Sequence, residues 1–100
     1  MARMTPSEAE QLLGNVPQDA AFRSYNGELY WNLKDLSRAL SSMDEATFGH
    51  HVTSRKNDFA NWTRDSIGDH ALARSLQETQ NQATTARRVS ERVAFLESRR

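Results

Sequence analysis

The histidines are the residues in this chain whose chemistry is most open to question. His50 and His51 are adjacent, and several aspartates lie nearby in the sequence. A helix that binds a metal usually carries its two histidines four residues apart, because both imidazoles then lie on one face. Adjacent side chains instead point about 100° apart on a helix. Together with the absence of cysteine, this spacing predicts no metal site and no other cofactor.

The patterns that usually accompany catalysis are missing from the sequence. It contains no nucleophile elbow, no glycine-rich phosphate loop and no paired-carboxylate motif. A chain of 100 residues also has few residues with which to enclose a ligand pocket of about 300 Å³. We therefore expect a protein that is not an enzyme, with no catalytic residue and no small-molecule substrate.

Four polar residues could form a recognition patch at a junction between helices. They are His51, Lys56, Asn57 and Asp58. The same residues also have structural uses, since Asn57 can cap a helix and Asp58 is favoured near a helix N-terminus. The next apolar residues, Phe59 and Trp62, supply one buried face of that helix. The structural interpretation accounts for most of this motif, and the recognition patch is the alternative.

Arginines gather in the last third of the chain. Residues 71–100 hold six Arg against three Glu, a net charge of +3, although the whole chain is neutral. Phosphate contacts need such cations, and Arg87, Arg88 and Arg92 could present them from one helix. A dedicated nucleic-acid binder is usually strongly basic as a whole. Nucleic-acid binding through this arginine-rich helix is therefore our alternative prediction.

A β-hairpin is predicted at about residues 22–31. Asn26-Gly27 separates two β-forming runs, and this pair suits the positive φ angles of a two-residue turn. Such a turn pairs residues 22–25 with residues 28–31. In this register Phe22, Leu29 and Trp31 are the candidates to face the core.

Helix signals fill the rest of the chain. Residues 5–8 form a capping box that begins a first helix, and Asn32 can cap a second with leucines at helical spacing. Ser42 begins another capping box, before a helix with Phe48 and Val52 one turn apart. Asn57 or Ser54 begins a further helix, and Gly68-Asp69 ends it and caps the next. The fold class predicted is mainly α, a small helical domain with an N-terminal two-stranded β-hairpin and four to five helices.

The last helix carries one apolar row. Its members, spaced three, four and three residues apart, are Ala86, Val89, Val93 and Leu96. This spacing keeps the row on one stripe that must be buried against the same chain or a second copy. The long polar segment 77–82 lets the helix swing away, so we favour the second copy. Residues 79–82 resemble a capping box and predict a break, although one helix over residues 70–98 is the alternative.

Length and composition predict a single domain over residues 1–100. Its parts are an N-terminal helix and connector (1–20), a hairpin plus helical core (21–80) and a C-terminal amphipathic helix (81–100). Hydrophobic residues make up only 37% of the chain, so the core is thin and self-association would help to cover it. No apolar run is long enough for a signal peptide or a membrane span. We expect a cytoplasmic protein that does not enter membranes.

Residues 48–62 carry the pattern Phe-x-His-His-Val, then Lys-Asn-Asp-Phe-Ala-x-Trp, followed by Ile67-Gly68-Asp69 and Leu72-Ala73. This pattern resembles a family of small uncharacterised prokaryotic domains that is common in archaea. The similarity covers about residues 22–96, with Thr63 in place of an aliphatic residue. It implies a compact domain without an assigned activity, and it transfers no catalytic residue.

These observations favour a non-enzymatic protein-protein interaction or oligomerisation module. The expected partner is a second copy, as in a homodimer, or another protein. Nucleic acid is a less favoured partner.

Overall fold

The computed structural model describes residues 3–100. Within them lie six α-helices and one two-stranded antiparallel sheet. In chain order these elements are α1 (Pro6–Leu13), β1 (Phe22–Arg23), β2 (Leu29–Tyr30), α2 (Leu33–Ser42), α3 (Glu45–His51), α4 (Asp58–Trp62), α5 (His70–Gln77) and α6 (Gln82–Arg99). The mainly helical class with an N-terminal hairpin is confirmed, with one helix more than the upper number expected.

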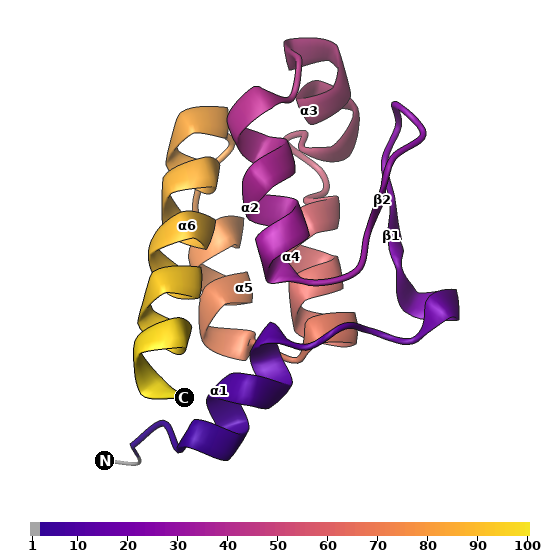
Figure 1. Cartoon of the computed structure of the whole chain (residues 1–100). Coiled ribbons are helices and arrows are strands. Elements are labelled where there is room, and N and C mark those ends of the chain that lie inside the picture. Colours follow the sequence, from indigo (N-terminus) through magenta and orange to yellow (C-terminus); the bar gives the residue numbers. More distant parts are fainter. Residues whose placement is uncertain (1–2) are drawn as a thin grey trace.

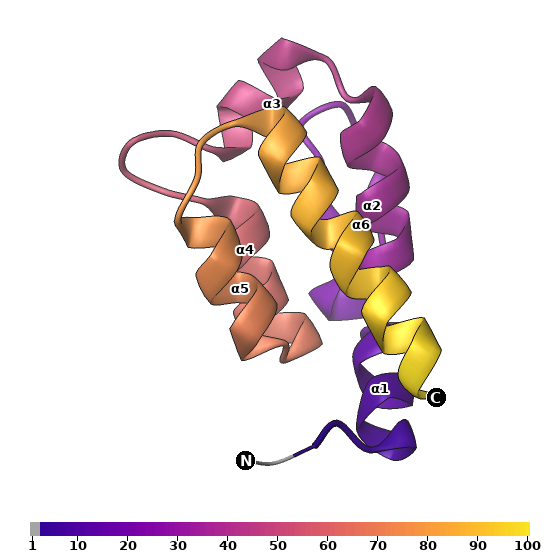
Figure 2. The same cartoon turned by 90° about the vertical axis from the view of Figure 1, so that its left-hand side faces the viewer.

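The helices pack around α6, the longest of them. Figure 1 shows α6 beside α2, with α1 at its C-terminal end and the hairpin on the opposite side of the molecule. Figure 2 shows α6 lying between α2 and α5, and both helices contact it. No helix within residues 3–100 is long and apolar enough to cross a membrane.

Side chains that accept hydrogen bonds from the first turn begin all six α-helices. These residues are Thr5, Asn32, Asp44, Asn57, Asp69 and Asn81. Two of these capping residues differ from the ones that the sequence predicted. Ser42 does not begin α3, because α2 extends through it and Asp44 caps α3 instead. At the predicted break, Thr79 accepts a hydrogen bond from the Asn81 N–H, and Asn81 rather than Thr79 caps α6.

The hairpin is present, but its turn has three residues rather than the two predicted. Phe22 pairs with Tyr30. The Ser24 carbonyl accepts a hydrogen bond from the Gly27 N–H, and the Ser24 N–H donates one to the Glu28 carbonyl. Gly27 has φ +93°, which is the left-handed position of a turn that ends in a glycine bulge.

This change of register moves the inward face of the second strand by one residue. A one-residue slip in a strand sends every side chain to the other face. Tyr30 is therefore buried and stacks on Phe22 at 5.6 Å between ring centroids. Leu29 is 43% exposed and Trp31 is half-buried, so the prediction that these two residues face the core is wrong.

The core joins the hairpin to the helices through aromatic side chains. Phe22 lies 5.0 Å from Phe59 and 5.8 Å from Trp62 between ring centroids. Both predicted core residues of α4 are buried, and the Trp62 indole N–H donates to the Ala20 carbonyl at 2.7 Å. The three leucines of α2, the apolar row of α6 and apolar residues of α1, α3 and α5 also belong to the core.

Candidate functional site

The structure brings three of the four predicted patch residues together. His51 ends α3, Asp58 begins α4, and Lys56 lies in the connection between them. One Asp58 oxygen, Oδ2, lies 2.9 Å from both the His51 Nδ1 and the Lys56 Nζ. A cluster of two basic side chains on one carboxylate therefore lies where the sequence predicted a helix junction.

His51 is held through both of its ring nitrogens. Its Nε2 lies 2.9 Å from the Tyr25 backbone nitrogen and accepts the hydrogen bond from that N–H. This contact requires Nε2 without a proton, so Nδ1 carries the proton and donates it to Asp58. The imidazole is 5% exposed and has no nitrogen left to take a proton from a substrate. Its position fixes the hairpin tip to α4.

The ionised form of Asp58 is favoured in this cluster. Partial burial raises its pKa, but the hydrogen bonds from His51 and Lys56 and the charge of Lys56 outweigh burial and hold the pKa below its usual value. The carboxylate is thus the negative partner that orients both basic side chains.

Asn57, the fourth predicted patch residue, points away from this cluster. Its Oδ1 accepts from the Ala60 N–H, and its Nδ2 donates to the Leu76 carbonyl, both at 3.0 Å. The side chain caps α4 and ties it to the end of α5. Its role in this structure is the capping role that the sequence indicated.

The adjacent histidines lie edge to face, with 5.0 Å between ring centroids, but in different surroundings. His51 points into the core, whereas His50 is exposed and its ring stacks on Tyr25 at 4.2 Å. No group of three or more histidine, aspartate and glutamate side chains in residues 3–100 converges as metal ligands would.

The apolar row of α6 packs inside the chain. Val89 and Leu96 are fully buried, Val93 is nearly so, and Ala86 is partly buried. The contacts of α6 are with α1, α2 and α5. In the single chain the row is buried against the same chain, which is one of the two alternatives, and the second copy that we favoured stays a prediction.

The three predicted nucleic-acid residues do not form one free stripe. Arg92 donates two hydrogen bonds to Asp69, at 2.7 Å and 3.0 Å, and Arg88 donates to the Ser75 carbonyl. Arg87 is exposed on another side of α6. Two of the three guanidiniums thus hold α5 against α6.

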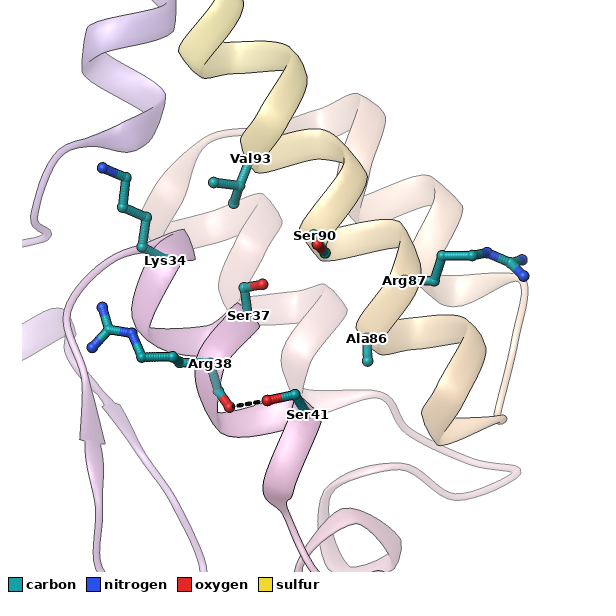
Figure 3. A pocket seen from close by; sticks show the side chains of 8 residues that line it. All are labelled: Lys34, Ser37, Arg38, Ser41, Ala86, Arg87, Ser90 and Val93. Carbon is teal, nitrogen blue, oxygen red and sulfur yellow. Dashed lines mark hydrogen bonds between the residues drawn. The ribbon is translucent and has the colours of Figure 1, made fainter.

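A groove runs between α2 and α6 (Figure 3). It has a volume of about 610 Å³. Its lining residues are Lys34, Ser37, Arg38, Ser41, Ala86, Arg87, Ser90 and Val93. Figure 3 shows Ser37 and Ser90 between the helices, with Lys34 and Arg38 along α2 and Arg87 extended outward from α6.

Sequence reasoning missed the α2 side of this groove. Lys34 and Arg38 lie four residues apart, as do Ser37 and Ser41, which places each pair on one side of the helix. That spacing is the signal for a polar flank on α2. Only the packing of α2 on α6 shows that this flank and Arg87 line one groove.

No protein-family model, no curated protein and no solved structure matches this chain. The resemblance to a family of small prokaryotic domains therefore stays a prediction.

Proposed function

We propose that this protein is a non-enzymatic interaction module that binds an acidic helix of another protein in the groove between α2 and α6. The observation that carries the proposal is the lining of that groove, which holds three cationic side chains and no carboxylate. A helix laid between two others is a common mode of protein recognition.

The floor of the groove suits close approach by a helix. Its central residues are serines and an alanine, and small side chains let a third helix backbone come near the other two. Val93 adds an apolar contact at one end. The small residues of the floor thus leave room for a helix, and the cations at the rim favour an acidic partner.

Two cations at the rim of the groove can exchange their present carboxylate partners for those of a bound helix. Lys34 pairs with Glu97 at 3.3 Å and Arg38 pairs with Asp35 at 3.4 Å, and both cationic side chains are substantially exposed. Exposed pairs of this kind contribute little, typically about 0–1 kcal/mol. A partner carboxylate can therefore replace the internal one at small cost.

Two observations favour a protein partner over the alternatives. Arg88 and Arg92 are held by groups of the same chain, which weakens the case for a phosphate-binding stripe on α6. The apolar row of α6 is covered by its own core, so a second copy has no apolar seam to occupy there.

The test is selection of random peptides, about 15 residues long, displayed on phage against the immobilised full chain. We expect enriched peptides with an apolar helical stripe flanked by Asp and Glu. The double variant Arg38→Glu/Arg87→Glu should bind them at least about tenfold more weakly, as measured by fluorescence anisotropy. Both substituted side chains are exposed, so the fold should be unaffected.

The matched control is Arg23→Glu/Arg55→Glu, which makes the same change of charge on exposed residues outside the groove. Its affinity should equal that of the wild type. Equal binding by the groove variant, or a selection that yields no acidic helical peptides, would refute the proposal. Binding of duplex DNA that weakens steeply between about 50 and 200 mM salt would favour the nucleic-acid alternative instead.

A further inference from the structure

Phe95 is an exposed aromatic residue on α6, outside the apolar row. Its side chain is 37% exposed, although it sits on the helix that forms much of the core. The Arg92 and Arg99 guanidinium carbons lie 5.2 Å and 5.0 Å from the centre of its ring. Because these arginines come one turn before and one turn after Phe95, they flank the ring along the helix.

Two hollows meet at this ring. One, of about 290 Å³, lies between α5 and α6 and is lined by Leu72, Arg88 and Arg92 among others. The other, of about 640 Å³, lies between the end of α6 and the segment before α1, where Arg3 and Arg99 line it. Phe95 lines both, so a ligand that lies beside the ring can contact the two hollows together.

Two of the four arginines around Phe95, Arg88 and Arg92, are held by groups of the same chain. Arg92 is held by two hydrogen bonds to Asp69, whose side chain is 1% exposed, and Arg88 is held by the Ser75 carbonyl. A side chain that is already ordered loses little conformational entropy when a partner binds. Arginine is one of the residue types enriched among those that dominate binding energy in protein interfaces.

We propose that the Phe95 surface is a second docking site, and that its occupant is a protein segment with one large apolar side chain between carboxylates. The two hollows are lined by four arginines and one acidic residue, Glu91. An apolar side chain would fill the space beside Phe95, and the flanking carboxylates would meet Arg3 and Arg99.

Other occupants fit this surface less well. Two copies that met through it would bring their arginines together, and like charges at an interface are costly. A nucleic-acid base would stack on a ring face, but the guanidiniums of Arg92 and Arg99 already lie over the Phe95 ring.

This site is independent of the groove proposed above. Residues of α2 and α6 line the groove, and residues of α5 and α6 line the smaller Phe95 hollow. Figure 2 shows α2 and α5 on opposite sides of α6. One chain could therefore hold two acidic segments, one on each flank of α6.

The test uses the full chain and a synthetic peptide with one tryptophan between aspartates, followed by amide chemical shifts in NMR spectra. We expect shifts at Phe95, Arg99 and Ala71 as peptide is added. Phe95→Ala and Arg99→Glu should each weaken binding at least about tenfold. Both residues are exposed, and retained amide dispersion would show that each variant is folded.

The matched control is Leu29→Ala, which removes an apolar side chain of similar exposure from the hairpin. It should bind the peptide as the wild type does, and so should Arg38→Glu/Arg87→Glu, because the groove is not involved. Unchanged affinity of Phe95→Ala, or shifts confined to the groove, would overturn this proposal without affecting the first.

Two further measurements can also overturn it. A mass increase in light scattering that Phe95→Ala abolishes would identify the occupant as a second copy. The same shifts on adding single-stranded DNA would identify a nucleic acid.

Discussion

At the scale of single residues, Asp69 joins α5 to α6. Its Oδ1 accepts from the Leu72 N–H, which caps α5, and its two oxygens accept from Arg92 on α6. The carboxylate is almost fully buried, whereas the Arg92 side chain is 20% exposed. An ion pair of this kind need not stabilise a protein much relative to apolar residues, but the removal of one partner leaves the other charge uncompensated.

Asp69→Asn is expected to destabilise the protein by about 3–5 kcal/mol, because the amide can still cap α5 but leaves the buried part of Arg92 without its counter-charge. Urea unfolding followed by circular dichroism measures this change. Asp65→Asn is the control, since Asp65 pairs with Arg64 on the surface and its loss should not alter the midpoint. A variant as stable as the wild type would show that the Asp69–Arg92 pair does not hold α5 to α6.

At the scale of elements, short-range signals predicted the helices well. The caps Thr5, Asn32, Asn57 and Asp69 could be predicted because a cap depends on side chains within one turn. The hairpin turn could not, because a glycine with positive φ fits both a two-residue turn and a three-residue turn with a bulge. The choice between them depends on which strand face meets the helices, and Tyr30 rather than Leu29 packs on Phe22.

In the candidate site too, contacts between residues close in the sequence could be predicted, and contacts between distant residues could not. His51, Lys56 and Asp58 lie within eight positions of one another in the sequence, and the sequence placed them at one helix junction. The pairing of Arg92 with Asp69 joins residues 23 positions apart, and it exists only because α5 packs on α6. The exposure of Phe95 likewise depends on where the N-terminal segment lies.

Glycines at two elements give opposite expectations for substitution by alanine. Gly27→Ala should cost about 1–2 kcal/mol, because a residue with a Cβ is strained at φ +93°. Gly49→Ala should stabilise the protein by about 0.5–1 kcal/mol, because Gly49 lies within α3 and an added Cβ meets nothing within 4 Å. Thermal unfolding of both variants and the wild type measures the difference. If the two substitutions changed the stability equally, the turn assigned at Gly27 would be contradicted.

At the scale of the whole molecule, α6 is both a core helix and the helix that carries both proposed binding surfaces. Its inner row closes the core against α1 and α2, and its two flanks line the groove and the Phe95 hollows. Because the row is buried in the core, the positions of both flanks depend on the fold of the entire chain. Changes to the fully buried row residues Val89 and Leu96 should therefore act on stability, and changes to exposed residues of the flanks should act on binding.

Val93→Asp with Leu96→Asp tests this division. Leu96 is fully buried and Val93 nearly so, and each unpaired charge placed there costs several kcal/mol. The total stability of a small domain is about 5–15 kcal/mol, so we expect the double variant to unfold throughout, with loss of near-ultraviolet circular dichroism and of hairpin amide dispersion. Phe95→Asp is the matched control, because it places the same charge on an exposed flank of α6 and should leave the fold intact. A double variant that kept its hairpin and core folded while its mass in light scattering fell by half would show instead that the row joins two copies.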